Sequence, residues 1–230
     1  MITRLPFLAL LTGAALVAAT GTLPGAEGHL VRGEVPLVPS SLAGPTWEVA
    51  GGEVEVRFSG ALQGSETGRA VWLEMNHPQR GIPIFTLIFE VRVGNELRIL
   101  EAAHLQGANP GPGEFPIRSL DELPGEPDPE FANIPDGFMI SYTAGTWSSW
   151  EEVAAIARSG AQDIEAFLER LTGGGYSSGG TLRLTGRVGD RIDGSFRAAM
   201  ILMDDDGNEL PFEAEGQFRA ERVDDPVGAR

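Results

Sequence analysis

The chain has 230 residues, no cysteine and a net charge of −16, because 33 acidic side chains face 17 basic ones, all of them arginine. A negative charge of this size argues against nucleic-acid binding and against adhesion to an anionic membrane surface, since both need clustered basic side chains. Without cysteine the chain has no disulfide, no thiol nucleophile and no zinc–thiolate site. Folded as one domain, it can bury roughly 70% of its unfolded surface, so its core needs no metal or disulfide.

Residues 1–26 have the pattern of a secretory signal peptide. Arg4 supplies the positive charge at the start, and the apolar stretch from Leu5 to Ala19 ends in small residues that permit cleavage. This stretch is shorter than the roughly 20 residues of a membrane span, although an uncleaved anchor is the alternative. We therefore expect an extracytoplasmic protein, periplasmic or secreted, with no transmembrane segment in the mature chain. Residues 27–52 follow as a leader or linker.

A single β domain is predicted over residues 53–223, with a tail over residues 224–230. Apolar and polar residues alternate from its first residues onward, which is typical of strands with one buried face. The stretch from Ile82 to Val93 is apolar on both faces, as in a strand buried on two sides. The next two residues, glycine and asparagine, supply a two-residue hairpin turn because both tolerate positive φ.

Residues 105–136 are predicted to form a long loop. They carry seven prolines and seven acidic residues against a single arginine, Arg118. Proline removes a backbone donor and fixes φ, so we expect neither a helix nor a strand ladder here. Loops of this length in compact domains are usually functional or disordered.

A helical insertion is predicted over residues 148–172. Two serines at its start each precede a glutamate by three residues, which is the capping-box spacing. Apolar residues then recur at helical spacing on both sides of Gly160. We expect two short helices, or one helix broken at Gly160, laid across a sheet or an open barrel end. The glycines from Gly173 to Gly175 are expected to end the helix, and Tyr176 to Gly180 to form a flexible loop.

The last third of the chain has the clearest strand pattern. The alternation of core-facing and solvent-facing residues there predicts the length of the final turn. Directly opposed residues point to the same side of a sheet, and a two-residue turn here would set core positions against solvent positions. We therefore predict a three-residue loop from Asp205 to Gly207, with Gly207 in the left-handed conformation. The resulting pairs are Met200 with Phe212, Ala198 with Ala214 and Arg197 with Glu215.

Together these elements predict a mainly β fold, an antiparallel β-sandwich or flattened open barrel of about eight or nine strands with one helical insertion. Short motifs over residues 80–222 add a resemblance: Gly113-Glu114-Phe115-Pro116-Ile117, Gly145-Thr146-Trp147, Ser178-Gly179-Gly180-Thr181-Leu182, Ile192-Asp193-Gly194-Ser195-Phe196 and Glu215-Gly216-Gln217-Phe218. In this order the chain resembles a group of uncharacterised exported bacterial β-domains, often lipoproteins. The resemblance implies a closing β meander and no catalytic residues. The chain departs from that group because it lacks a lipid-bearing cysteine and carries the helical insertion.

Three aromatic residues, Trp147, Trp150 and Tyr176, flank the helical insertion and are candidate ligand-binding residues. At a barrel mouth or a sandwich rim, such side chains stack on sugars or apolar ligands. The helical spacing of the two tryptophans fits core packing equally, so both interpretations stay open at this point.

The acidic run from Asp204 to Glu209 offers a candidate metal site, with Asp204, Asp206 and Asn208 as the ligands. Calcium loops of the EF type place glycine at the sixth position, whereas here glycine is the fourth. A solvated hairpin turn is therefore the alternative to weak divalent-ion binding. No other cofactor is predicted, since the chain has no phosphate-binding loop or dinucleotide fingerprint.

We expect an exported, non-enzymatic β module that binds a ligand or protein partner through its loops or an open end. The partner classes are a small molecule, a glycan or an envelope protein. One alternative is a polysaccharide-directed hydrolase with unrecognised carboxylates, which would show two carboxylates about 5 to 10 Å apart in a cleft. The other is a structural envelope component, which would show a solid core and no site.

Overall fold

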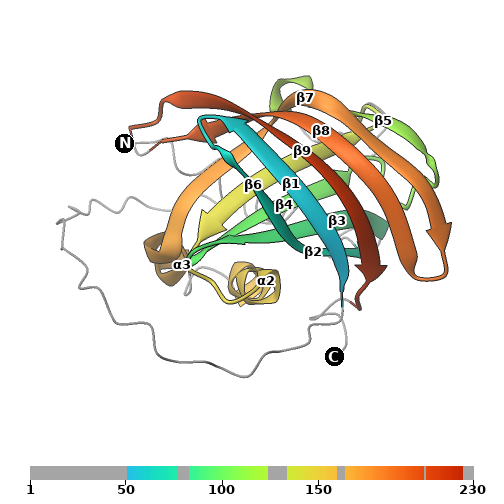
Figure 1. Cartoon of the computed structure of the whole chain (residues 1–230), viewed down its shortest axis with the longest axis horizontal. Coiled ribbons are helices and arrows are strands. Elements are labelled where there is room, and N and C mark those ends of the chain that lie inside the picture. Colours follow the sequence, from blue (N-terminus) through green and yellow to red (C-terminus); the bar gives the residue numbers. More distant parts are fainter. Residues whose placement is uncertain (1–50, 77–82, 124–133, 160–163, 205, 225–230) are drawn as a thin grey trace.

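A computed structural model describes residues 51–76, 83–123, 134–159, 164–204 and 206–224. In these ranges nine mainly antiparallel strands form one sheet that closes on itself as a ring (Figure 1). The strands are β1 (Gly52–Gly60), β2 (Gly64–Asn76), β3 (Pro83–Val93), β4 (Glu96–His104), β5 (Gly113–Ile117), β6 (Phe138–Gly145), β7 (Leu171–Val188), β8 (Arg191–Met203) and β9 (Glu209–Arg222). The predicted fold class is confirmed. The predicted signal peptide, most of the leader and the tail beyond Asp224 lie outside the described residues.

The ring runs in the order β1–β2–β3–β4–β6–β5–β7–β8–β9 and closes where β9 pairs with β1. It is not a regular barrel, because β6 pairs with both β5 and β7 and the end of β9 also pairs with the middle of β2. The helical insertion lies outside the ring as α2 (Trp150–Ser159) and α3 (Ile164–Arg170), below the strands in Figure 1. None of the described helices is long and apolar enough to cross a membrane.

The predicted register of the last two strands is confirmed. Met200 pairs with Phe212, Ala198 with Ala214 and Arg197 with Glu215. The backbone N–H of Asp204 donates to the Asn208 carbonyl at 3.1 Å, which closes the loop. Gly207 has the predicted left-handed conformation, with φ of 83°. Asp205 itself lies outside the described residues.

The expected loop from Tyr176 to Gly180 is wrong, because these residues belong to β7. This strand begins at Leu171, directly after α3, so Gly173 to Gly175 do not end a helix either. Gly175 lies close to the neighbouring strand, and a Cβ atom there would be 2.3 Å from the Ile201 carbonyl oxygen. Glycine in this stretch therefore permits close approach of two strands rather than a turn.

The expectation of no ladder in residues 105–136 is also wrong, because β5 lies within them. β5 pairs with β7 over its whole length, including Pro116 opposite Thr181. On its other side β5 meets β6 at one pair only, Ile117 with Phe138. Because β5 is almost unpaired on one side, Pro116 removes no backbone N–H that the ladder needs, and the strand tolerates it.

Two apolar clusters stabilise the fold, one inside the ring and one outside it. The inner cluster fills the interior with side chains from the strands, among them Val56, Trp72, Phe85, Phe89, Phe138, Ile140, Tyr142, Leu182, Phe196 and Phe212. The outer cluster lies between the outer face of β2, β3 and β4 and the helical insertion, and comprises Val71, Leu73, Ile88, Leu97, Ile99, Trp147, Trp150, Val153, Ala154 and Phe167. β3 is therefore buried on both faces, as its sequence predicted.

Candidate ligand-binding site

The two candidate tryptophans lie in the outer cluster. Trp147 is 2% exposed and Trp150 is 4% exposed, and Trp147 stacks on Phe167 with ring centroids 5.1 Å apart. Both indole N–H groups are buried and have no hydrogen-bond partner among the residues that the structure describes. Burial of this extent fits the packing interpretation, while a ligand role for either tryptophan stays a prediction.

Tyr176, the third aromatic candidate, lies apart from the tryptophans. It is half-buried on the outer face of β7, opposite Ser141 and Ile201, and its hydroxyl donates to Glu209 at 3.3 Å. Burial raises the pKa of this hydroxyl, and the neighbouring carboxylate of Glu209 raises it further. The structure thus brings the two tryptophans together but does not join Tyr176 to them.

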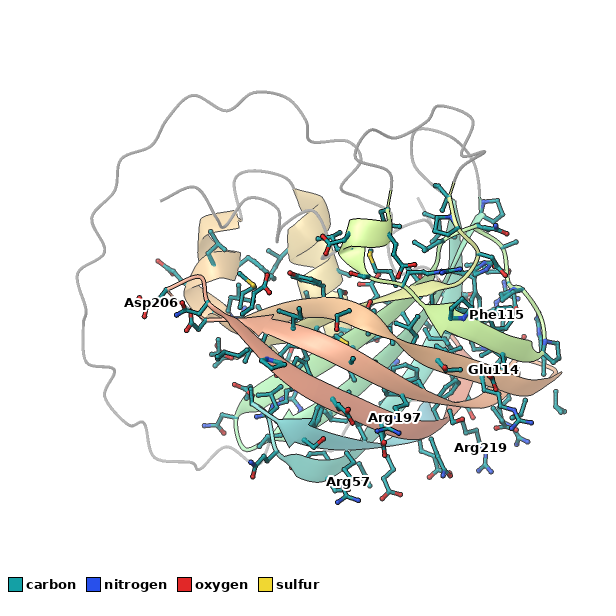
Figure 2. The ribbon with its side chains drawn as sticks, turned by 90° about the horizontal axis from the view of Figure 1, so that it is seen from above. Arg57, Glu114, Phe115, Arg197, Asp206 and Arg219 are labelled. Atoms are coloured by element: carbon teal, nitrogen blue, oxygen red, sulfur yellow. The ribbon has the colours of Figure 1, made fainter. Side chains whose placement is uncertain are left out.

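The three candidate metal ligands lie at the turn between β8 and β9, with Asp206 at the tip of the sheet (Figure 2). The Asp204 carboxylate accepts the backbone N–H groups of Asp206 and Asn208, at 3.0 and 2.7 Å, and the Asn208 side-chain amide at 2.9 Å. The bond from the Asn208 side chain is the main reason that the pKa of Asp204 is lowered. No group of three acidic or histidine side chains suited to a metal occurs within the described ranges. Divalent-ion binding at this turn stays a prediction.

A largely buried ionic contact anchors the helical insertion to the sheet. Glu90, on the outer face of β3, accepts the Trp150 backbone N–H at 2.7 Å and so caps the start of α2. Arg69 joins Glu90 at 3.2 Å to Glu151 of α2 at 2.7 Å. Burial raises the pKa of Glu90, although the Trp150 bond and the charge of Arg69 partly offset this effect.

Two charged side chains of β4, Glu96 and Arg98, face into the ring at one end, which we call the hairpin end because the β1–β2 hairpin borders it. Arg98 pairs with Ala144 of the inner cluster, and its guanidinium lies 5.6 Å from the centroid of the Phe58 ring. Arg98 Nε donates to Glu96 at 2.7 Å, and the other Glu96 oxygen accepts the Thr172 hydroxyl at 2.8 Å. Among the described residues, the terminal nitrogens of Arg98 have no hydrogen-bond partner.

Tyr142 of β6 points into the ring at the same end. It is 1% exposed, and its ring packs edge-on against Phe58 and Phe212. Its hydroxyl has no hydrogen-bond partner in the part of the chain that the structure describes. Burial raises the pKa of this hydroxyl; the nearby charge of Arg98 lowers it and that of Glu96 raises it. The hydroxyl therefore lies close to this ion pair without being bonded to it.

A surface hollow of about 590 Å³ lies on the β1–β2 hairpin. Phe58 lines both this hollow and the hairpin end of the inner cluster. Exposed polar groups line the rest of it, namely Glu55, Arg57, Ser59, Gln63 and Ser65. Arg57 forms no ion pair with any residue that the structure describes. The hollow is within the size range of small-ligand sites, which lies at about 300 to 1,000 Å³.

The arrangement at the hairpin end is suited to binding. Arg98, Tyr142 and Arg57 have donor groups without a hydrogen-bond partner among the described residues, while both oxygens of Glu96 are engaged. The Glu55 carboxylate lines the hollow beside them. A few polar groups at the edge of an apolar interior, one with a perturbed pKa, are typical of a ligand site. The sequence-based candidates missed this site entirely.

The sequence signal that could have identified it is the pair Glu96 and Arg98, two charges spaced so that they share one face of a strand. Leu97 and Ile99 alternate with them, and both belong to the outer cluster under the helices. No protein-family model, curated protein or solved structure matches the chain. The resemblance to exported β-domains therefore stays a prediction, and a functional argument depends on geometry.

Proposed function

We propose that the protein is a non-enzymatic module that binds a ligand rich in hydrogen-bond acceptor oxygens at the hairpin end of the ring. The observation that carries this proposal is the Tyr142 hydroxyl, which forms no hydrogen bond with a described residue and lies close to the Arg98–Glu96 pair. The ligand class includes small molecules and glycans. Because side chains fill the interior, we assign the ligand to this end of the ring and to the hollow beside it.

Tyr142 supports the proposal through the donor that it leaves unused. Its side chain is 1% exposed, and its hydroxyl forms no hydrogen bond with a described residue. A polar group at the edge of an apolar interior is typical of a ligand site, and an acceptor oxygen of a ligand would complete its hydrogen bond.

Binding is favoured over hydrolysis because Glu96 is not free to act as a base. One of its oxygens is bonded to Arg98 and the other to Thr172. Glu90 and Glu151 share Arg69 as their partner and are likewise engaged, and Glu90 is covered by α2. Neither Glu96 nor this pair offers the free carboxylate that glycoside hydrolysis needs.

The proposal is tested with the two tyrosines of the chain. Three probes, acetate, acetamide and methyl glucoside, are titrated against isotope-labelled protein. We expect at least one of them to shift the resonance of the Arg98 Nε–H and those of the β1–β2 hairpin. Tyr142→Phe should weaken that response about tenfold, since it removes one donor, while the matched Tyr176→Phe should leave it unchanged.

Tyr142→Phe also separates binding from a structural role. We expect it to change the free energy of unfolding by less than about 0.5 kcal/mol, because the hydroxyl forms no hydrogen bond with a described residue. Unchanged stability together with loss of probe binding supports the proposal. No probe response from the parent protein at the hairpin end would contradict it and favour the structural alternative.

We propose further that the mature protein is extracytoplasmic, which rests on the sequence of residues 1–26. Fractionation of cells that express the full chain should place it outside the cytoplasm. Mass spectrometry should then show a new N-terminus after Ala19 or Ala26. An intact N-terminus in the cytoplasmic fraction would rule out this location.

A further inference from the structure

We propose a second site, independent of the first: the turn between β7 and β8 binds a phosphate group. In Figure 1 this turn lies at lower right, at the other end of the ring from the β1–β2 hairpin. The two sites share no residue, so either proposal can fail without the other.

Two arginines cover the buried indole of Trp72 at this end of the sheet. The guanidinium carbons of Arg187 and Arg222 lie over Trp72, at 4.8 and 5.3 Å from the ring centroid. Trp72 is 0% exposed and belongs to the inner cluster, whereas both arginines are exposed to solvent. Both guanidinium groups therefore lie on the solvent side of the indole, and attraction to its π-electrons holds them there.

These two cations lack the counter-charges that other arginines of the chain have. Among the described residues, Arg187 has no carboxylate within ion-pair distance, and Arg222 has only Asp190, at 4.0 Å. Arg197 and Arg219 each contact two carboxylates. Acidic side chains outnumber basic ones by 33 to 17, so a shortage of acids does not explain the difference. An anion at Arg187 and Arg222 would offset the repulsion between them.

The turn is held in place without using the terminal nitrogens of either arginine. Trp72 Nε1 and the Arg222 backbone N–H both donate to the Asp190 carbonyl, each at 2.8 Å. Arg187 Nε donates to the Gly189 carbonyl at 2.9 Å. Their terminal nitrogens are left without a hydrogen-bond partner among the described residues. Donors that are already ordered lose little freedom when an anion binds.

The ligand class follows from guanidinium chemistry. Two guanidinium groups offer forked donors that match the several oxygens of a phosphate, as a single point charge would not. The net negative charge of the chain opposes a polyanion such as nucleic acid, but charges further than about 8 Å away are largely screened at physiological ionic strength. A single phosphate group is therefore the anion that the turn accommodates.

The phosphate has two potential sources, a soluble phosphate or the headgroup of an anionic lipid. Val188, at the tip of the same turn, is 70% exposed, and among the described residues Leu210, at 37%, is the only other exposed large apolar side chain. Beside two arginines, an exposed aliphatic tip would touch the apolar part of a lipid surface. The experiment below separates the two sources.

The test is titration of inorganic phosphate, followed through the Trp72 Nε1–H resonance and the Nε–H resonances of Arg187 and Arg222. We expect all three to shift with a common binding curve. Arg187→Gln or Arg222→Gln should weaken phosphate binding about tenfold, while the matched Arg197→Gln should have no effect. Asp190→Asn should tighten it, because it removes the competing carboxylate and keeps the backbone carbonyl.

Two results would overturn the proposal: no shift at these resonances across the titration, or equal weakening in the Arg197→Gln control. Sedimentation with phosphatidylglycerol vesicles, against phosphatidylcholine vesicles, then identifies the source. Binding to the anionic vesicles that is lost in Arg187→Gln and reduced in Val188→Ser assigns a lipid headgroup. Phosphate binding without vesicle binding assigns a soluble phosphate.

Discussion

The ring has two sides that differ in what covers them. On one side the outer positions of β2, β3 and β4 are apolar and lie beneath α2 and α3. On the other side the outer positions of β8, β9 and β1 carry charged ladders, in which Arg197 contacts Glu213 and Glu215 and Arg219 contacts Glu53. Figure 2 shows Arg57, Arg197 and Arg219 on the side away from the helices. Alternation of polar and apolar residues therefore indicates which face of a strand is buried only where the other face is exposed to water.

The largest expected effects come from alanine substitutions at consecutive positions on each side. On the uncovered side, Phe212→Ala should cost about 3 to 5 kcal/mol, because it empties part of the inner cluster. The adjacent Glu213→Ala should cost less than about 0.5 kcal/mol. On the covered side both neighbours should matter: Phe89→Ala about 3 to 5 and Ile88→Ala about 2 to 5 kcal/mol.

Chemical denaturation measures these four free energies of unfolding. If Ile88→Ala lowers the free energy of unfolding as little as Glu213→Ala does, the contrast between the two sides is contradicted, since the helices would then not bury the outer face of β3.

The same contrast explains how much of the fold could be predicted from the sequence. The register at Gly207 was predictable because β8 and β9 alternate cleanly, with one face in the core and one in water. β5 was not predictable, since Pro116 argues against a strand unless the strands that pair with β5 are known. The glycine-rich start of β7 likewise has no side-chain pattern, and only the close approach to Ile201 explains it.

The candidate site was missed for a related physical reason. In β4 the apolar Leu97 and Ile99 alternate with Glu96 and Arg98, and simple alternation would place the charged pair in water. The helices reverse this outcome, because they bury Leu97 and Ile99 on the outer face and leave Arg98 facing the interior. A helix that is distant in sequence thus decides which face of β4 holds the charges.

Loss of an ion pair should cost more stability on the side covered by the helices than on the uncovered side, as it does for the apolar positions. Arg69→Met should cost about 2 kcal/mol, because Glu90, whose side chain is 9% exposed, is left without its cation. Arg197→Met, whose side chain is 67% exposed, should cost less than about 0.5 kcal/mol. Chemical denaturation of both variants gives the comparison. Adding Glu90→Gln to Arg69→Met should restore part of the loss, and no restoration would mean that the charge of Glu90 is not the cause.

Glu90 should also make stability depend on pH. Its pKa is raised in the folded state, so the folded protein binds a proton more readily than the unfolded chain, whose glutamate pKa is near 4.5. The contribution of Glu90 is therefore most favourable in acid and declines as pH rises through its folded pKa. The difference in unfolding free energy between Glu90→Gln and the parent protein should increase as pH rises above 4.5. A difference that is flat with pH would contradict the raised pKa.

Glu152, in α2 of the helical insertion, should show the opposite pH dependence with a smaller effect on stability. Arg170 contacts it at 2.6 Å and, as the main cause, lowers its pKa to about 2, while Ser148 donates two further hydrogen bonds. Its contribution is full above the unfolded pKa of 4.5 and is lost as pH falls towards 2. Because both partners are about one-third exposed, with side-chain exposures of 34% and 32%, Glu152→Gln should cost only about 0.5 kcal/mol at neutral pH. Thermal melts of both glutamine variants from pH 2 to 7 should therefore diverge from the parent in opposite directions, and parallel curves would mean that burial does not distinguish the two glutamates.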